Sequence, residues 1–401
     1  MIRLLTFTSL YPNAAQPRHG VFVEERLRHL VASGGLTAAV VAPVPWFPFR
    51  YSRFGAYAAL ATVPEREERY GIQISHPRYP VLPKVGMSIA PFLMYRALLP
   101  VLRKLKANGA DFDLIDAQYF YPDGVAAAKL GMAMNKPVVI TARGTDVTLI
   151  PHYRLPRRQI KWAAERVAAI VTVSQALKDA LAALGVNPDK ITVLRNGVDL
   201  DHFRPLDRTV IRARLGLTGP VWLSVGHLIE RKGLHITLPA LAKTPDVTLL
   251  IAGDGPEEGK LRRLANSLGV GERVRFLGAI AHADLCEYYN AADALVLASS
   301  REGMPNVVLE ALACGTPVIA TRVEGTPEII TSPEAGELMQ ERSPEALVLA
   351  WNKLQAHTPD RISTRKYAEQ LGWAPTVRAQ LALYVRVLSD YGNYSRAEVT
   401  P

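Results

Sequence analysis

Short apolar runs alternate with helix-like patterns along most of the chain. In the first half these runs cover residues 2–7, 37–43, 112–118, 137–142, 168–174 and 191–197. A second series follows at residues 221–226, 247–253, 273–278, 294–300, 317–322 and, more weakly, 335–340. Such an alternation is typical of βα units, whose strands form parallel sheets. The pattern therefore predicts an α/β protein.

The restart of the series after residue 205 predicts two Rossmann-like domains. A chain of 401 residues exceeds one ordinary core, since a domain holds roughly 150 residues. We place the first domain at residues 1–205 and the second at residues 206–373. A final helical pattern at residues 374–392 is expected to pack back on the first domain.

Composition narrows the class of partner. The chain has 49% hydrophobic and 21% charged residues, as ordinary globular proteins do, and 47 Lys and Arg against 37 Asp and Glu give a formal net charge of +10. This excess suits a phosphorylated substrate, an anionic lipid or a nucleic acid. The basic residues are scattered and no nucleic-acid motif is present, so we do not expect a nucleic-acid partner.

Neither the cysteines nor the hydropathy indicates secretion or a membrane span. Cys286 and Cys314 are too few for a disulfide framework and do not have a metal-ligand spacing. No apolar stretch approaches about 18 uninterrupted residues, and residues 1–12 fit a first strand better than a signal peptide. The sequence thus predicts a cytoplasmic protein.

Residues 84–106 differ in character, because they mix Met, Phe, Leu and Pro with Lys and Arg at both ends. As a helix this segment is amphipathic, and with residues 46–54 it could lie as a peripheral element on the anionic inner face of the cell membrane. The alternative is a helix that faces the core and has basic ends. The sequence leaves both interpretations open.

Two acidic residues flank a turn in the second series. Glu302 precedes a Gly-Met-Pro-Asn turn, and Glu310 lies about one turn into a helix predicted to begin near Pro305 or Asn306. The free N–H groups at that helix start form an anion site, and the Glu310 carboxylate can approach the same ligand from the side. Carboxylates accept hydrogen bonds from vicinal hydroxyls, so a nucleoside-diphosphate sugar fits. Acids that only offset the helix dipole are the alternative.

Cations and glycines follow two other strands of the second series. Arg231 and Lys232 could stabilise a leaving diphosphate, or they could form a solvated turn closed by Gly233. Gly253 and Gly255 follow the next strand, where the sequence is equally consistent with a plain turn.

The first series carries fewer candidates. Arg143 and Asp146 directly follow an apolar strand, either as site residues or as a salt-bridged turn, and Gly20 lies in the long loop after the first strand. Asp111 and Asp113 form a D-x-D pair, a pattern that holds a divalent metal in many sugar transferases. Because this pair precedes its strand, we expect no metal site.

Together these features resemble the retaining glycosyltransferases of family 4, which share the GT-B fold of two Rossmann-like domains with parallel sheets facing across a cleft. The similarity spans nearly the whole chain. The matching segments are Gly20, "TARGTD" at 141–146, "RNGVD" at 195–199, "GHLIERKG" at 226–233, "AGDGP" at 252–256, "RVRFLG" at 273–278, the E-x7-E unit from Glu302 to Glu310, and "GTPVIAT" at 315–321.

The resemblance implies a nucleoside-diphosphate sugar bound mostly by the second domain and an acceptor sugar or lipid-linked glycan bound by the first, with catalysis in the cleft and no metal or other cofactor. Glu302 and the backbone after it would hold the transferred sugar, Glu310 the ribose, and Lys232 the diphosphate, with Arg231 as a second diphosphate contact. The implied product is a bacterial cell-surface polysaccharide or glycolipid.

The same resemblance assigns the remaining site residues. The backbone around residues 273–278, especially at Arg275 and Phe276, would border the base, and Gly20 would let its loop approach the phosphates. The implied catalytic residues are Glu302, Lys232, Arg143 and Asp146. The implied donor-binding residues are Gly20, His227, Arg231, Lys232, Gly253, Gly255, Arg275, Phe276, Glu302, Gly303, Met304, Pro305, Asn306, Val307 and Glu310.

Two positions depart from the family pattern. His227 stands where the family usually has an arginine that contacts the diphosphate, and Arg143 stands where a histidine is common. In this family the anomeric configuration is retained, and an oxygen of the leaving diphosphate takes the proton of the acceptor. Arg143 would then act by holding a hydroxyl or by offsetting charge.

Two other functions remain open. A nucleotide-sugar 2-epimerase has a similar two-domain fold and would share the donor site, but it needs acid-base groups at the sugar ring that the sequence does not suggest. A catalytically silent donor-binding subunit would be favoured by loss of the Glu or Lys positions, and these residues are present.

Overall fold

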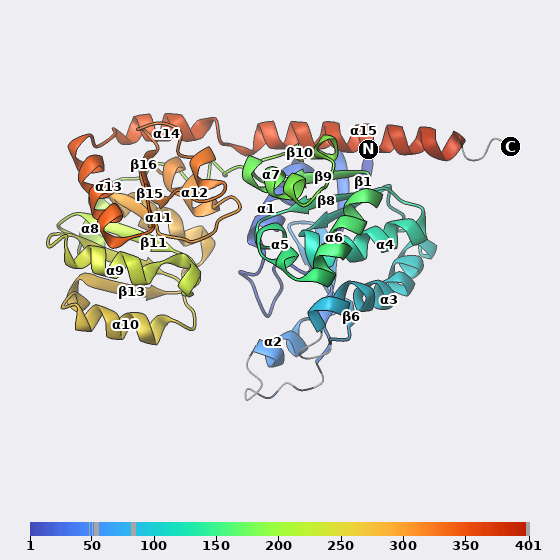
Figure 1. Cartoon of the computed structure of the whole chain (residues 1–401), viewed down its shortest axis with the longest axis horizontal. Helices are drawn as coiled ribbons and strands as arrows, with labels where there is room; N and C mark the ends of the chain where they lie inside the picture. The colour runs from blue at the N-terminus through green and yellow to red at the C-terminus, as the bar shows by residue number, and fades with distance from the viewer. Residues whose placement is uncertain (48, 50, 52–55, 82–85, 398–401) are drawn as a thin grey trace. The chain divides into compact units, whose positions relative to one another are not determined.

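The computed structural model describes residues 1–47, 49, 51, 56–81 and 86–397, and the chain folds into two compact units (Figure 1). Unit 1 comprises Met1–Arg195 and Ala374–Pro401, and unit 2 comprises Asn196–Trp373. Each unit is built on its own largely parallel sheet, so the predicted α/β class with two sheet domains is confirmed. The units change at residue 195, whereas the sequence interpretation placed this boundary at residue 205.

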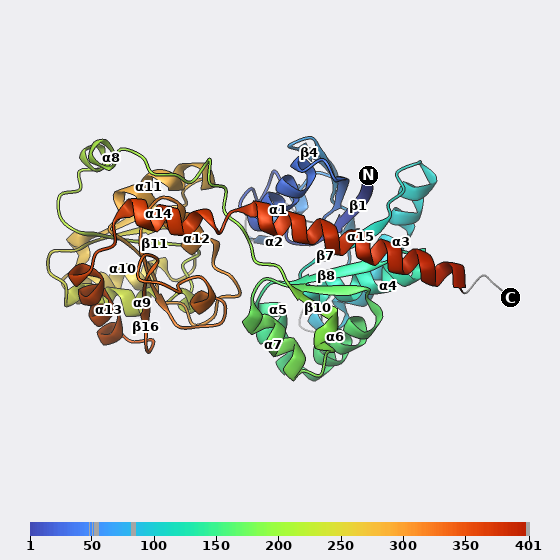
Figure 2. The ribbon, with the colours of Figure 1, turned by 90° about the horizontal axis from the view of Figure 1, so that it is seen from above.

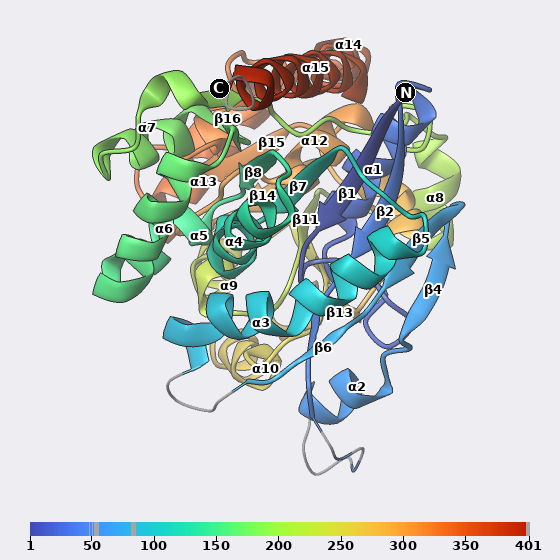
Figure 3. The same ribbon diagram turned by 90° about the vertical axis from the view of Figure 1, so that its right-hand side faces the viewer.

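Unit 1 contains an eight-stranded sheet in the order β10-β9-β8-β7-β1-β2-β5-β4, in which β4 alone runs antiparallel to its neighbour. Figure 3 shows β5, β2, β1 and β7 side by side. The strands are β1 Ile2–Phe7, β2 Leu36–Val41, β4 Arg66–Arg69, β5 Ile72–Ser75, β7 Leu114–Gln118, β8 Val138–Ala142, β9 Ala169–Thr172 and β10 Ile191–Val193, with β3 Val44–Pro45 and β6 Arg78–Tyr79 paired separately.

Helices cover this sheet, and α3, α4 and α6 pack against one another. The helices of unit 1 are α1 Val21–Ala32, α2 Ala56–Thr62, α3 Gly86–Ala107, α4 Val125–Met134, α5 Thr145–Thr148, α6 Arg154–Arg166, α7 Gln175–Ala183 and α15 Trp373–Ala397, whose first residue belongs to unit 2. In the part of the chain that the structure describes, no helix is both long enough and apolar enough to cross a membrane.

The β4–β5 hairpin was absent from the sequence prediction. β4 is the polar sequence Arg-Glu-Glu-Arg, because an edge strand has few buried positions, and it therefore lacks the apolar run on which the prediction relied. The two strands are joined by a tight turn at Tyr70–Gly71, where both residues have positive φ, of 53° and 74°, as such a turn requires. The glycine in this turn was the signal that the sequence offered.

Helix α3 covers most of the segment predicted as amphipathic. Its buried residues include Met94, Leu98 and Leu102, so one face packs on the core, as the core-facing interpretation requires. Met87 and Phe92 are exposed near its beginning. Residues 84 and 85 of the predicted segment, and several of residues 46–54, lie outside the described residues.

The C-terminal helix α15 packs against unit 1 through a buried polar contact. The guanidinium of Arg26, on α1, donates from Nε to Oε1 of Gln380 on α15 at 2.6 Å, and from Nη1 to the carbonyl of Leu194 at 3.2 Å. Burial lowers the pKa of Arg26. This helix is therefore part of the core of unit 1, although it follows unit 2 in sequence.

Unit 2 contains a fully parallel six-stranded sheet in the order β13-β12-β11-β14-β15-β16. Trp222 on β11 and Trp351 on α13 meet edge to face in the core beneath it, with ring centroids 5.6 Å apart. The strands are β11 Val221–Val225, β12 Thr248–Ala252, β13 Val274–Gly278, β14 Ala294–Leu297, β15 Val318–Thr321 and β16 Gly336–Met339. All six were predicted from the sequence.

The helices of unit 2 form two groups. Figure 2 shows α9 and α13 on one side of β11, and α8 and α11 on the other. The helices are α8 Arg208–Arg214, α9 Leu234–Ala242, α10 Glu258–Ser267, α11 Leu285–Ala291, α12 Asn306–Ala313, α13 Pro344–Ala356 and α14 Arg361–Glu369.

The parallel strands of each sheet reverse their order at one point, between β1 and β7 in unit 1 and between β11 and β14 in unit 2. At such a point the loops leaving the carboxyl ends of neighbouring strands diverge, and ligands of open α/β sheets bind there. The loops after β11 and β14 contain Lys232 and Glu302, so the topology of unit 2 brings the two predicted segments to one edge.

Candidate functional site

The carboxyl edge of unit 2 brings Lys232 and Glu302 into contact. Nζ of Lys232 donates to Oε1 of Glu302 at 2.6 Å, and Oγ of Ser299 donates to the same oxygen at 2.7 Å. Arg231 lies 3.5 Å from this oxygen and also donates to the carbonyl of Arg301 at 2.7 Å. One carboxylate therefore holds two cations next to the start of α12.

The charge state of Glu302 follows from these neighbours. Burial raises the pKa of its carboxyl group, but the positive charges of Lys232 and Arg231 outweigh burial and bring the pKa below its usual value. Glu302 is therefore ionised at neutral pH, and it orients the ammonium group of Lys232.

Helix α12 begins as predicted, with Pro305 in the N-cap position and Asn306 as the first helical residue. The side-chain oxygen of Asn306 accepts a hydrogen bond from Asn196 at 2.8 Å. Met304 and Pro305 are buried, while Gly303, Asn306 and Val307 are partly exposed. The backbone of Gly325 donates to the carbonyl of Glu302 at 3.1 Å, so this turn is fixed from both sides.

Glu310 lies on α12 with both carboxylate oxygens occupied. The phenol of Tyr289 donates to Oε2 at 2.6 Å, and Nε2 of His282 lies 3.0 Å from Oε1. Tyr289 belongs to α11, and His282 belongs to the 3-10 turn His282–Asp284 that follows β13. Glu310 is only 5% exposed. Its carboxylate is therefore buried and held by Tyr289 and His282, and it is not a solvated acidic residue on the helix surface.

Gly253 lets two loops at this edge approach closely. A Cβ atom at Gly253 would lie 1.9 Å from the carbonyl oxygen of Gly226, in the turn after β11, and Gly253 donates to the carbonyl of Gly278 at 2.7 Å. A Cβ at Gly255 would lie 2.5 Å from the carbonyl oxygen of Leu228. Both glycines are thus required by the packing of the loops themselves.

The side chains of Arg275 and Phe276, on β13, contact other parts of unit 2. Arg275, the second residue of β13, pairs with Leu250, and its guanidinium donates to the carbonyls of Leu215 and Gly216, in the loop before β11. The ring of Phe276 packs under the guanidinium of Arg262, 4.2 Å from its centroid, beside the core. Their side chains therefore serve the strand and its neighbouring loops, and the assignment of the backbone at these two residues to the border of the base stays a prediction.

His227 follows β11 and remains at the surface. Its side chain is 59% exposed, and Nδ1 lies 3.8 Å from Oδ1 of Asp254. The structure thus places it in the same group of loops as Lys232 with only a loose contact to the protein.

In unit 1, Gly20 allows the loop after β1 to fold back on itself. Gly20 is the N-cap of α1 with φ of 75°, and a Cβ there would lie 2.4 Å from the carbonyl carbon of Leu10. The same loop is anchored by Asp123, whose Oδ2 accepts from the backbone N–H of Ser9 at 2.8 Å and from its hydroxyl at 2.9 Å. Burial raises the pKa of Asp123 to about 7.

Arg143 lies at the carboxyl end of β8 and is held by two neighbours. Its Nε donates to Oε1 of Gln118, the last residue of β7, at 3.1 Å, and its guanidinium carbon lies 4.9 Å from the ring centroid of Phe22 on α1. Burial, assisted by the charge of Arg26, lowers the pKa of Arg143 to about 9, so this side chain remains a cation at neutral pH.

Asp146 binds backbone N–H groups of the loops after β7 and β8. It is fully buried, and its oxygens accept from the backbone N–H groups of Phe120 at 2.7 Å, Gly144 at 2.7 Å and Arg143 at 3.1 Å. Burial raises its pKa. Asp146 therefore shapes the loops after β7 and β8 and sets the backbone from which Arg143 projects.

Asp111 and Asp113 are engaged in ion pairs before β7. Asp113 pairs with Arg3 at 2.5 Å, and Asp111 pairs with Lys136 at 3.2 Å. Among the residues that the structure describes, no three His, Cys, Asp or Glu side chains gather as a metal-binding group.

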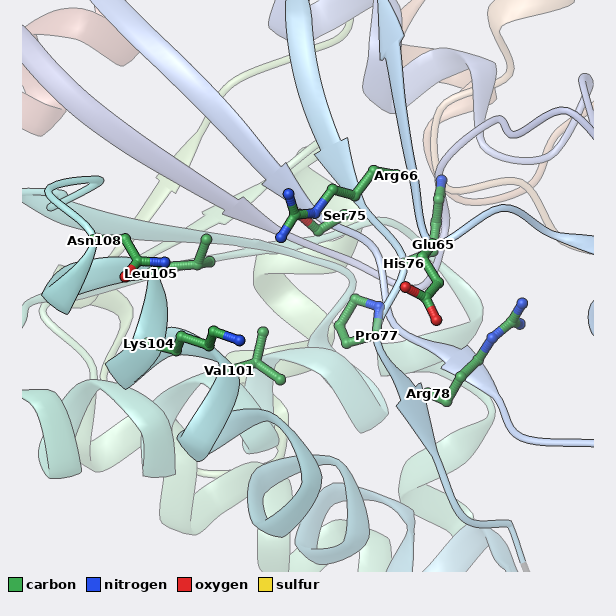
Figure 4. Close-up of a pocket in the computed structure, with 10 residues that line it drawn as sticks. All are labelled: Glu65, Arg66, Ser75, His76, Pro77, Arg78, Val101, Lys104, Leu105 and Asn108. Carbon is green, nitrogen blue, oxygen red and sulfur yellow. The ribbon is translucent and has the colours of Figure 1, made fainter.

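A pocket of about 180 Å³ lies in unit 1 between α3 and the β4–β5 hairpin (Figure 4). In Figure 4, Lys104 extends from α3 toward Pro77, and Arg66 approaches from β4. None of the sequence-predicted site residues lines this pocket.

Sequence reasoning missed the partners of the predicted residues. Ser299 on the Glu302 carboxylate, Gln118 on Arg143, and Tyr289 and His282 on Glu310 were not identified. Gln118 offered a signal, because it ends an apolar strand at the edge where ligands bind. Cys286 and Cys314, which are too few for a disulfide framework, are both free, with their sulfur atoms 3.7 Å apart.

Two family models match the chain in succession. The model described as Glycosyltransferase Family 4 matches residues 20–202, and the model described as Glycosyl transferases group 1 matches residues 207–371. The first match covers most of unit 1 and the second most of unit 2.

Curated relatives include two bacterial glycosyltransferases. The chain is 30% identical to TuaC of Bacillus subtilis (strain 168), over 99% of this chain and 97% of that protein. The name of that protein describes it as a teichuronic acid biosynthesis glycosyltransferase. It is 35% identical over 248 residues to the D-inositol 3-phosphate glycosyltransferase of Mycobacterium tuberculosis (strain F11), a match to 58% of this chain and 51% of that protein.

Solved structures share the fold at lower identity. Sucrose-phosphate synthase from Thermosynechococcus elongatus superposes with a TM-score of 0.75 and 21% identity, over 97% of this chain and 99% of that one. HepE from Anabaena, in complex with UDP and glucose, gives a TM-score of 0.73 and 23% identity over 96% of this chain and 100% of that one.

Proposed function

The chain belongs to glycosyltransferase family 4 and has the GT-B fold, and from this premise we propose that it moves a sugar from a nucleoside diphosphate to an acceptor hydroxyl with retention of anomeric configuration. The observation that carries this proposal is the contact of Lys232 with Glu302 at the carboxyl edge of unit 2. A cation for a diphosphate and a carboxylate for sugar hydroxyls lie there side by side.

The donor is proposed to bind unit 2. The start of α12 offers backbone N–H groups and Lys232 offers an ammonium group to the diphosphate, while Glu302 accepts from the transferred sugar and Glu310 from the ribose. The structural neighbour HepE has been solved with UDP and with UDP-glucose, which supports a sugar nucleotide as donor.

The reaction follows from these positions. The bond from the anomeric carbon to the phosphate oxygen breaks, and both electrons go to that oxygen, whose negative charge Lys232 and Arg231 offset. The acceptor oxygen then attacks the same face of the sugar, and its proton passes to the departing phosphate oxygen. Because these cations belong to the chain itself, we propose that the reaction needs no divalent metal.

The acceptor is proposed to bind unit 1 near Arg143. This guanidinium can hold an acceptor hydroxyl or offset charge, but as a cation it cannot remove a proton. The name of the Bacillus subtilis relative supports an acceptor in the synthesis of a bacterial cell-surface polysaccharide or glycolipid.

We also propose peripheral contact with the anionic inner face of the cell membrane. Trp46, Phe49, Met87 and Phe92 are exposed on unit 1, at 57%, 48%, 42% and 50%. The formal net charge of +10 favours an anionic surface. Flotation with anionic but not neutral liposomes, weakened by salt, is the expected result. Absence from both kinds of liposome would count against this contact.

The experiment that tests the transferase activity follows release of nucleoside diphosphate from a panel of sugar nucleotides, with and without candidate acceptors, and analyses the product anomer by NMR. Acceptor-dependent release with a retained anomer is expected. Conversion of the sugar nucleotide without an acceptor would indicate an epimerase, and donor binding without turnover on any acceptor would indicate a silent donor-binding subunit.

A further inference from the structure

Glu310 is held by two donors that approach different oxygens. Tyr289 donates its phenol to Oε2 at 2.6 Å, and His282 places Nε2 3.0 Å from Oε1. Tyr289 is fully buried, whereas the side chain of His282 is 29% exposed. The carboxylate is thus fixed from the inside by a phenol and from the surface side by an imidazole.

This arrangement leaves two acceptor sites on Glu310. An ionised carboxylate has about four lone-pair positions, two on each oxygen. Tyr289 and His282 use one on each oxygen, so one position remains on each. Two neighbouring acceptor positions match two vicinal hydroxyls, and the 2′- and 3′-hydroxyls of a ribose are such a pair.

The two donors are themselves supported. The backbone carbonyl of Tyr289 accepts from the hydroxyl of Thr316 at 2.6 Å. The ring of Phe203 packs edge to face on both donors, with centroids 5.9 Å from Tyr289 and 5.2 Å from His282. Burial raises the pKa of Tyr289 well above its usual value, so its phenol stays a donor.

We propose that Tyr289 and His282 are positioning residues that orient the Glu310 carboxylate and thereby set a preference for ribonucleotides over 2′-deoxyribonucleotides. Neither side chain needs to touch the donor for this effect. The inference rests on the proposed function, because it assumes that Glu310 accepts from the ribose.

The test compares each nucleotide with its 2′-deoxy counterpart. Calorimetric titration of the wild-type protein with UDP, GDP and ADP identifies the diphosphate that binds most tightly, and the same diphosphate without its 2′-hydroxyl is then titrated. The variants are Tyr289→Phe, which removes one O–H group, and His282→Gln. Tyr288→Phe is the matched control, since Tyr288 is the neighbouring tyrosine on α11 and interacts electrostatically with Arg214.

We expect the wild-type protein to prefer the ribonucleotide by about tenfold or more, as the loss of a hydrogen bond to a charged group implies. Tyr289→Phe and His282→Gln should each lower this ratio several-fold, mainly by weakening the ribonucleotide, while Tyr288→Phe should leave the ratio unchanged. Thermal unfolding of each variant establishes that it is folded, and His282→Gln tests the proposal even if Tyr289→Phe is not.

Equal weakening of both nucleotides, with an unchanged ratio, would show a purely structural role and overturn the inference while leaving the proposed function intact. If the wild-type protein bound none of the three diphosphates, the proposed donor site and this inference would both be overturned.

Discussion

Lys232 and Glu302 are 70 residues apart in sequence, yet Nζ and Oε1 lie 2.6 Å from each other at the point where the sheet of unit 2 reverses its strand order. If Lys232 binds the donor diphosphate as proposed, it has to exchange or share this carboxylate partner, and the two residues should respond differently to substitution.

Lys232→Met should lower both turnover and affinity for the nucleoside diphosphate, because it removes a charge that stabilises the leaving group. Glu302→Gln should lower turnover by a similar factor but leave diphosphate affinity equal or higher, because Lys232 is released from its partner. Steady-state kinetics and calorimetry measure both quantities. Lys243→Met, at an exposed pair with Glu345, is the control. A parallel loss of diphosphate affinity in both site variants would contradict the assigned roles.

Glu310→Gln should weaken binding of the nucleoside diphosphate by about 1.5–3 kcal/mol, the range for hydrogen bonds to a charged group. The substitution keeps the shape of the side chain, so the packing with Tyr289 should persist. Titration calorimetry with the free diphosphate makes the measurement, and Glu302→Gln serves as the comparison. An unchanged affinity in Glu310→Gln would place the ribose elsewhere.

Arg143→Lys should keep part of the activity by retaining the charge, and Arg143→Ala should lose most of it, while donor affinity changes little in either variant. Gln118→Ala should lower turnover less than Arg143→Ala, because it removes the partner that orients the guanidinium but not the charge. Rates at saturating donor decide this point. Wild-type turnover in Arg143→Ala would make this arginine structural.

Asp123 should make stability depend on pH. Its carboxyl has a pKa of about 7 in the folded protein, against an ordinary value of 3.8 for an aspartate. A group whose pKa is raised on folding contributes stability that is fully present below its pKa in the unfolded protein. This contribution is lost as the pH rises through its pKa in the folded protein. Between about pH 4 and 7, one such group changes the free energy of unfolding by at most about 1.4 kcal/mol per pH unit.

Asp123→Asn should remove this dependence, since its amide does not ionise and its oxygen can still accept from Ser9. Urea unfolding at pH 5 and pH 8 gives the comparison. The free energy of unfolding of the variant minus that of the wild type should be larger at pH 8 than at pH 5. If the difference between the two proteins were the same at both pH values, the Asp123 carboxyl would titrate near its ordinary pKa.

Chelation should leave the transferase activity intact if Lys232 and Arg231, which both pair with Glu302, supply the positive charge at the leaving group as proposed. Assay after treatment with EDTA measures this directly. Complete loss of turnover that magnesium or manganese restores would refute metal independence. If the D-x-D pair were then the metal site, Asp113→Asn would have to prevent the metal from restoring activity. If it is not, Asp113→Asn removes only the ion pair with Arg3.

The residues that could be predicted are those whose position depends on a strand end. Lys232 and Glu302 each follow an apolar strand, and parallel strands deliver their carboxyl ends to one edge, so the sequence pattern was enough to bring them together. The side-chain partners of Arg275 could not be predicted, because a side chain within a strand points to whatever covers that face of the sheet.

The partners of the site residues could not be predicted because they depend on packing between helices that are remote in sequence. Tyr289 reaches Glu310 only because α11 lies beside α12, and nothing in the spacing of the two residues states that contact. β4 was missed for a related reason, since an edge strand pairs through its backbone and needs no apolar side chains.

The position of helix α15 at the end of the chain determines the order in which the two units can complete their folding during translation. Arg26 and its acceptor Gln380 are separated by 354 residues, and all of unit 2 is translated between them. At a bacterial or eukaryotic ribosome adding about 5–20 residues per second, this interval is on the order of 18–71 s. During that time the N-terminal part of unit 1 carries a guanidinium that has not met its final partner, whereas unit 2 can close as soon as it emerges. The first domain to be started is therefore the last to be finished.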